Sequence, residues 1–148
     1  MRVYRSFIAL HHLHCVQQIQ ATHSAFAAIR SDGSVVAWGP PDSGGDSSAV
    51  QGELQSVQSI QATARAFAAI CSDSSVVTWG SPDYGGNSSA VQHQLRSVES
   101  IQATQSAFAA ICSDGSVVAW GSAMEGGDSS AVQVELKIVH QIQATQSA

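Results

Sequence analysis

The chain is built from a repeat with a period of 41 residues. The longest recurring stretch reads Ala-Phe-Ala-Ala-Ile-x-Ser-Asp-x-Ser-Val-Val-x-Trp-Gly and occurs at 25–39, 66–80 and 107–121. The sequence Ile-Gln-Ala-Thr precedes each copy and occurs a fourth time from Ile142. No insertion or deletion interrupts the period, which is typical of proteins made of stacked structural repeats. A unit of this size cannot bury its own apolar face, so neighbouring units must supply the core.

The period also predicts the organisation of the chain. We expect residues 1–12 to form a non-repeating N-terminal arm and residues 13–148 to form the repeat region. The units cover about residues 19–59, 60–100 and 101–141, and a partial fourth unit starts at 142. Two architectures fit such units, a β-propeller with one unit per blade and an open solenoid.

Each unit is expected to contain three short strands. In the second unit, polar and apolar residues alternate over 58–63, residues 66–71 form an apolar run, and Val-Val-Thr-Trp follows; all three patterns favour strands. The Asp-Gly pair between the last two strands of the first and third units predicts a type I′ hairpin turn. The second unit has Asp73-Ser74 there, which predicts a strained turn or another turn type.

A short helix is expected after the third strand of each unit. The spacing of Ser48 and Gln51 is that of a capping box, in which a serine and a glutamine side chain cap the helix start reciprocally. Val50 and Leu54 follow on one helical face. This helix would stand in for an outer strand of the sheet.

The order and spacing of these residues resemble the repeat of the regulator-of-chromosome-condensation family. The matching residues are Val57-x-x-Ile-Gln-Ala-Thr, Ala-Phe-Ala-Ala-Ile, Ser-Asp-x-Ser-Val-Val-x-Trp-Gly and Tyr84-Gly-Gly. The family pattern has Val-x-x-Ile-Ala-Ala-Gly, Asp-Gly-x-Val-Tyr-x-Trp-Gly and Tyr-Gly-Gln-Leu-Gly at these places. The resemblance runs from about Leu13 to the end of the chain and covers about three repeats. It implies a mainly β fold that forms part of a β-propeller, which has seven blades in the family.

The resemblance also implies a function. Family members are binding platforms, so we expect a non-catalytic protein–protein interaction module that binds a protein partner. The module would be a fragment of a larger protein, such as a HERC-type ubiquitin ligase whose catalytic domain lies outside this chain. One alternative is a guanine-nucleotide exchange factor for a small GTPase. Another is a self-assembling structural repeat, because a three-blade arc leaves open sheet edges that invite self-association.

Composition excludes several other classes of protein. Charged residues make up 11% of the chain, and its six lysines and arginines are scattered, so no nucleic-acid partner is expected. No apolar run approaches the roughly 18 residues of a membrane-spanning helix, so no membrane contact is expected. No secretory signal is recognisable, which predicts an intracellular protein, cytoplasmic or nuclear.

Few residues are candidates for chemistry. Potential metal ligands gather only at His11, His12, His14 and Cys15, without the second ligand pair that a structural zinc site usually has. We therefore expect no metal and no cofactor. Catalysis would need a triad, a carboxylate pair or a metal set, and none recurs here, so we expect that the chain is not an enzyme.

Two groups of residues are expected to define the repeat. The aromatic residues that recur in every unit are predicted to form the core between units, since aromatic side chains dominate core burial; they are Phe26, Trp38, Phe67, Trp79, Phe108 and Trp120. Partner binding is expected where the units differ, because loops on a rigid scaffold usually determine specificity. The candidates are Tyr84, Asp83, His93 and Glu125, with Tyr84 as the strongest.

Overall fold

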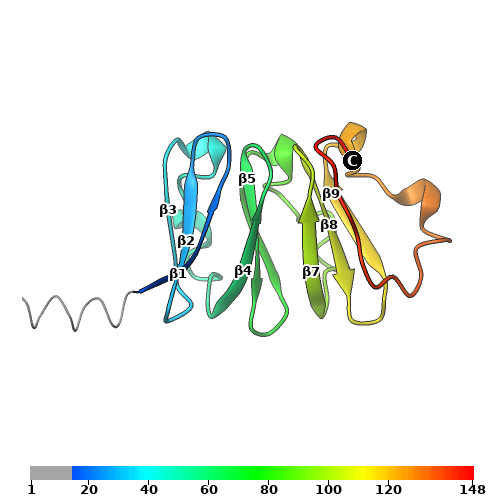
Figure 1. Ribbon diagram of the computed structural model, residues 1–148, viewed down its shortest axis with the longest axis horizontal. Helices are drawn as coiled ribbons and strands as arrows, with labels where there is room; N and C mark the ends of the chain where they lie inside the picture. Colours follow the sequence, from blue (N-terminus) through cyan, green and yellow to red (C-terminus); the bar gives the residue numbers. More distant parts are fainter. Residues whose placement is uncertain (1–14) are drawn as a thin grey trace, which may run out of the picture.

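The computed structural model describes residues 15–148 and is mainly β, as predicted. The expected arm at 1–12 and the candidates His11, His12 and His14 lie outside the described residues. Three antiparallel sheets of three strands each stand side by side (Figure 1). The strands are β1 (Val16–Ala21), β2 (Phe26–Arg30) and β3 (Val35–Trp38); β4 (Val57–Ala62), β5 (Ala66–Cys71) and β6 (Val76–Gly80); β7 (Val98–Ala103), β8 (Ala107–Cys112) and β9 (Val117–Gly121).

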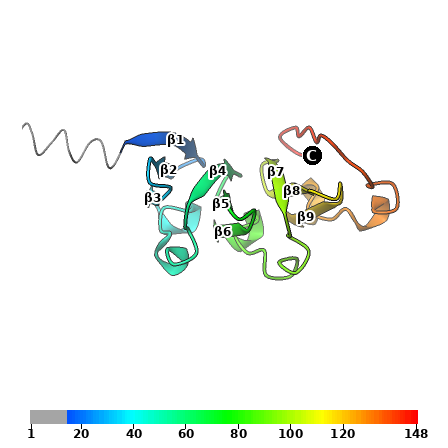
Figure 2. The same ribbon diagram turned by 90° about the horizontal axis from the view of Figure 1, so that it is seen from below.

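The three sheets are arranged as blades of a partial β-propeller. In each sheet the strands follow chain order, and the middle strand pairs with both neighbours. Figure 2 shows β1, β4 and β7 on one side of the row and β3, β6 and β9 on the other. The middle strand β5 is buried along all six residues, because sheets on either side cover both of its faces.

The hairpin turns between the second and third strands differ from the predicted type I′. Arg30 N donates to Ser34 O, so three residues form the loop, and Gly33 N donates to Arg30 O. Within the described residues only Gly33 of this loop has a positive φ, +81°, whereas a type I′ turn needs two such residues. The loop is instead a type I turn followed by a left-handed residue. In the second unit Ser74 takes that position at a φ of +67°, which agrees with the predicted strain.

The predicted capped helix is a single 3₁₀ turn in the first and third units, η2 (Ser48–Val50) and η5 (Ser130–Val132), and no helix is assigned at this place in the second unit. Another single 3₁₀ turn precedes this segment in each unit: η1 (Pro41–Ser43), η3 (Pro82–Tyr84) and η4 (Ala123–Glu125). The predicted capping box is wrong, because no side chain caps the start of η2 and the Gln51 side chain bonds other partners. Its Nε2 donates to Val35 O at 3.1 Å and to Ser47 Oγ at 2.7 Å, and Leu54 is buried. The glutamine thus bonds the outer edge of β3, so the segment does stand in for an outer strand.

The core lies between the sheets. Alternate residues of each strand point to opposite faces. Phe67 and Trp79 face the first sheet and pack with Ala27, Ile29 and Val35. Ala66 and Ala68 on the other face pack with Phe108 and Trp120 of the third sheet. Each interface therefore joins an aromatic face to a face of small residues.

A hydrogen bond recurs at each of these interfaces. Trp79 Nε1 donates to Gly44 O at 3.0 Å, and Trp120 Nε1 donates to Gly85 O at 3.1 Å. A Cβ at Gly44 would lie 2.6 Å from Phe67 Cδ2, so only glycine lets the aromatic ring approach the loop this closely.

Four of the six predicted core aromatics are buried. Phe67, Trp79, Phe108 and Trp120 are between 0% and 4% exposed. Phe26 and Trp38 differ from this prediction at 45% and 46%, because no segment within residues 15–148 packs against their side of the first sheet. The same phenylalanine and tryptophan of the repeat are therefore buried or exposed according to the position of the unit in the row.

Candidate functional site

The turns between the first and second strands meet η1, η3 and η4 at one end of the sheets, the upper end in Figure 1. We call this end the loop face. A threonine of each unit holds the two segments together: Thr22 Oγ1 donates to Ser43 O at 2.9 Å, Thr63 Oγ1 to Tyr84 O at 2.8 Å, and Thr104 Oγ1 to Glu125 O at 2.9 Å. The same hydrogen bond therefore anchors a serine, a tyrosine and a glutamate at the equivalent position of the three units.

A second position on the loop face varies together with the first. Ser24 Oγ donates to Ser43 Oγ at 3.0 Å in the first unit. In the second, the guanidinium carbon of Arg65 lies 5.4 Å from the centre of the Tyr84 ring, a cation–π contact. In the third, Ser106 Oγ donates to Glu125 Oε2. The face thus carries a neutral, a cationic–aromatic and an acidic pair in succession.

The predicted partner-binding residues lie in three segments, two of them on the loop face. Tyr84 is half-buried against the second core cluster, and Asp83 beside it is exposed. Glu125 holds the position of Tyr84 in the next unit. His93 lies apart from them in the loop before β7, exposed, with its ring nitrogen Nε2 3.4 Å from Gln94 Nε2.

The inner margin of the loop face is hollowed across all three units. His23 N donates to Ala64 O, Ala64 N to Gln105 O, and Gln105 N to Gln146 O, at 2.9, 2.8 and 2.7 Å. A groove of about 290 Å³ follows this row, and Thr22, Thr63 and Thr104 are among its lining residues. Since His23, Ala64 and Gln105 stand at the same position of the three units, the groove differs from unit to unit along its length.

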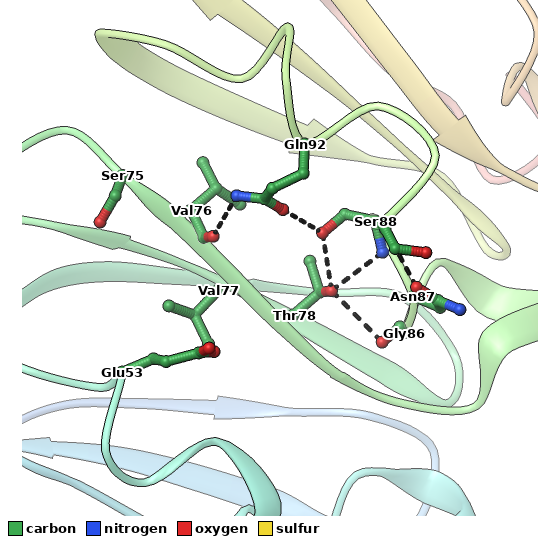
Figure 3. Close-up of a pocket in the computed structure, with 10 residues that line it drawn as sticks. Glu53, Ser75, Val76, Val77, Thr78, Gly86, Asn87, Ser88 and Gln92 are labelled. Carbon is green, nitrogen blue, oxygen red and sulfur yellow. Dashed lines mark hydrogen bonds between the residues drawn. The ribbon is translucent and has the colours of Figure 1, made fainter.

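A larger hollow of about 560 Å³ lies on the outer side of the second unit (Figure 3). Its polar side chains bond one another and the backbone: Gln92 Nε2 donates to Val76 O, Ser88 Oγ donates to Gln92 Oε1, and Thr78 Oγ1 donates to Gly86 O. Glu53 is the one ionisable side chain among the lining residues. These bonds hold the loop against β6, and we assign the hollow a structural role.

Cys71 is a weak candidate for a reactive thiol. Burial raises the pKa of the Cys71 thiol, and its Sγ contacts Glu53 O at 3.7 Å. Cys112, in the same place of the third unit, is buried too. A raised pKa keeps a thiol protonated, and a protonated thiol is a weak nucleophile.

The metal candidates are only partly described. Cys15 is half-buried, and its carbonyl accepts a hydrogen bond from Ser31 N. Within residues 15–148, no three histidine, cysteine or acidic side chains are grouped as metal ligands. No helix in the same residues is long and apolar enough to cross a bilayer.

Sequence reasoning missed the partners of the predicted residues on the loop face. It singled out Tyr84 and Glu125 as variable, and it did not connect them with Arg65 and Ser106, which lie 19 residues earlier. The signal was available, because both positions vary between units while the threonine two residues before the first of them does not.

No protein-family model matches the chain, and no curated protein matches it in sequence. Among solved structures it resembles yeast RCC1 (Prp20) bound to Kap60, with a TM-score of 0.55 and 16% identity, covering 73% of this chain and 30% of that one. It also resembles Prp20p from Saccharomyces cerevisiae, studied with its binding properties to Gsp1p and histones (TM-score 0.54, 16% identity, 73% and 31% covered). A third similar structure is human WBSCR16 (TM-score 0.51, 17% identity, 73% and 34% covered).

The chain spans about a third of the length of these structures. The likeness confirms the predicted RCC-type repeat at the level of the fold, a partial β-propeller. Because identity is this low, the likeness carries the fold alone.

Proposed function

We propose that this chain is a non-catalytic protein–protein interaction module, part of an RCC-type propeller in a larger protein, and that its partner binds the loop face. The supporting observation is the invariant threonine bond beneath a variable pair of side chains. Conserved backbone geometry under changing side chains is how repeat scaffolds build specific surfaces.

The second unit supplies the strongest anchor of this surface. Arg65 is exposed, and Tyr84 is fixed beneath it by the cation–π contact and by packing of its ring. Tyrosine and arginine are the residue types that most often dominate binding energy at protein interfaces. A preordered pair loses little side-chain entropy when a partner binds. Asp83, next to Tyr84 in the chain, and Glu125, at the equivalent position of the next unit, add negative charge to the loop face, which favours a partner of mixed polarity.

The proposal is tested by affinity capture with the full chain. Wild type, Arg65→Ala/Tyr84→Ala and a control are immobilised, and retained proteins are identified by mass spectrometry and then measured with purified partner. The control is Asp73→Asn, in a hairpin turn at the opposite end of the second sheet. We expect the double variant to bind at least about tenfold more weakly and the control to bind normally. A folded double variant with unchanged affinity would place the partner elsewhere.

The likeness to Prp20p, whose binding to Gsp1p was measured, favours a second candidate function. The alternative is nucleotide exchange on a small GTPase. Mixing the chain with a GTPase loaded with a fluorescent nucleotide discriminates the two, since an exchange factor accelerates release and a passive module does not. We expect no acceleration. The ubiquitin-ligase context and an intracellular location, cytoplasmic or nuclear, belong to the same proposal.

A further inference from the structure

The outer face of the first sheet exposes a surface that the other two sheets bury. Phe26 and Trp38 stack with ring centres 5.4 Å apart and are 45% and 46% exposed. Their counterparts Phe67 and Trp79 stack at 5.2 Å and are 0% and 4% exposed, because they pack on the preceding unit. The first sheet therefore carries the aromatic half of an interface that the molecule forms twice internally.

The far side of the third sheet carries the other half. An apolar cavity of about 200 Å³ is lined there by Ala109, Ala119, Leu136 and Gly126 among others. In the second sheet the corresponding small residues pack against the aromatic pair of the third. A Cβ at Gly126 would have Ala148 Cα as its nearest neighbour, 4.0 Å away, whereas at Gly85 it would meet the Phe108 ring at 2.6 Å. The third sheet thus has the receiving face without an aromatic ring beside its glycine.

A strand-like segment lies on the rim of this cavity. Residues 139–145 read Val-His-Gln-Ile-Gln-Ala-Thr and differ at one position from residues 16–22, Val-Gln-Gln-Ile-Gln-Ala-Thr. Val139 N donates to Gly115 O at 2.9 Å, as Val57 N does to Gly33 O at the same distance. The segment therefore docks on the third unit as a first strand would, but it pairs with no second strand within residues 15–148.

The strand it resembles is the least buried first strand of the three. Val16 and Ile19 of β1 are 54% and 52% exposed, whereas Val57 and Ile60 of β4 are 4% and 1% exposed. The strand β1 is held by its pairing with β2, with little burial of its apolar side chains. A segment of nearly identical sequence can take over that pairing at small net cost.

We propose, independently of the function proposed above, that the 148-residue chain itself associates: a second copy docks head to tail on the third unit, in the place that a neighbouring propeller unit would take. The Phe26–Trp38 pair of the second copy fills the cavity beside Gly126, and residues 139–145 of the first copy replace β1 as the partner of the second copy's β2. The internal interfaces supply the geometry, with Trp38 Nε1 donating to Gly126 O as Trp79 Nε1 does to Gly44 O. The gain is burial of the aromatic pair, since one paired strand is exchanged for another.

Such a contact joins different faces of the two copies. Heterologous contacts give a closed ring when the rotation between copies closes and an open chain when it does not. This mode of association uses the blade faces. It does not use the outer sheet edges, since β3, β6 and β9 already accept hydrogen bonds there from Gln51, Gln92 and Gln133.

The first test is the mass of the full chain in solution, measured by light scattering from low to high micromolar concentration. We expect a mass above the 15.4 kDa of one chain that rises with concentration. Trp38→Ala should weaken association at least about tenfold. Met124→Ser is the matched control, since Met124 is 94% exposed and its counterparts Asp42 and Asp83 take no part in the internal interfaces. A chain that stays monomeric throughout overturns the proposal.

The second test distinguishes strand exchange from any other association. Val16 pairs with Arg30 in the β1–β2 register, so Val139 of one copy should face Arg30 of the next. With Cys15→Ser as background, Val139→Cys/Arg30→Cys should form disulfide-linked oligomers, and each single variant should not. Position 30 tolerates the change, because Cys71 and Cys112 occupy it in the other units.

A locked variant completes the design. In the same background, Val16→Cys/Arg30→Cys ties β1 to its own β2 by an internal disulfide, and we expect this chain to remain monomeric until reduced. Association that survives both this lock and Trp38→Ala would overturn the proposal in favour of another surface.

Discussion

The first and second units have nearly the same sequence and the same pairing register, and they differ in what surrounds them. Both stack a phenylalanine on a tryptophan, with ring centres 5.4 and 5.2 Å apart. The pair is buried in the second unit and half-exposed in the first. Local structure therefore forms independently of stacking, whereas burial depends on the neighbour.

This difference separates two kinds of stabilisation in a repeat protein. Hairpin turns, strand pairing and aromatic stacking belong to one unit, and the core belongs to the interface between two. Substitutions of matched residues should reveal which kind each residue serves, since intrinsic and interface contributions add nearly independently in such arrays.

The largest expected effect is loss of the interface tryptophan. Trp79→Ala should lower the free energy of unfolding by about 3–5 kcal/mol, because it empties a buried site and removes the bond to Gly44 O. Trp38→Ala should cost about 1 kcal/mol, since half of that side chain already contacts water. Urea denaturation at low micromolar concentration measures both. Equal losses of unfolding free energy would mean that the tryptophan stabilises the protein through the stack within its own unit and not through the interface.

The glycines of the three loops sharpen the same comparison. Gly44, Gly85 and Gly126 have φ values of +91°, +93° and +95°, so alanine meets the same backbone strain at each, about 1 kcal/mol. A Cβ at Gly44 or Gly85 would also collide with an aromatic ring at 2.6 Å, while Gly126 has open space. We expect Gly44→Ala and Gly85→Ala to cost about 1–3 kcal/mol more than Gly126→Ala in the same denaturation experiment. Three equal losses of stability would mean that the positive φ alone accounts for the effect of alanine.

The strands and the stacking of units could be predicted from the sequence, because period-2 alternation and a strict 41-residue repeat survive in any context. The capping box could not. Ser48 and Gln51 have the right local spacing, but the glutamine's partner is the carbonyl of Val35, 16 residues earlier in the chain. An edge carbonyl that needs a donor is visible only once the sheet exists.

The type of the hairpin turn and the contacts within the candidate site were missed for related reasons. An Asp-Gly pair fits both a two-residue and a three-residue loop, and the register that selects the longer one is set by the pairing of β2 with β3. On the loop face, variability marked Tyr84, while its contact with Arg65 depends on the Thr63 bond that brings η3 over the preceding turn. Pairwise contacts across a fold are tertiary information.

A smaller effect on stability is expected at the left-handed residue of the hairpin turn. Ser74 has a left-handed φ of +67° where Gly33 and Gly115 have +81°. Ser74→Gly should raise the free energy of unfolding by about 0.5–1 kcal/mol, because it relieves the contact between Cβ and the backbone. Gly115→Ser should have the opposite effect, since a Cβ there would lie 2.5 Å from Ile138 Cα. Thermal unfolding of both variants checks this, and a loss of stability in Ser74→Gly would contradict it.

The smallest effect concerns the turn carboxylates, which should behave alike in the stacked and terminal units. The Ser75 hydroxyl and N–H donate to Asp73 Oδ1 and lower the pKa of Asp73, and Ser116 does the same for Asp114. A lowered folded-state pKa contributes stability above the ordinary carboxyl pKa, and this contribution is lost as the pH falls through the folded value. Asp73→Asn and Asp114→Asn should therefore each melt slightly below wild type at neutral pH and approach it in acid, where wild type is protonated too. Because both side chains are fully exposed, the two differences should be equal; a larger one for Asp73 would show that stacking reaches even this turn.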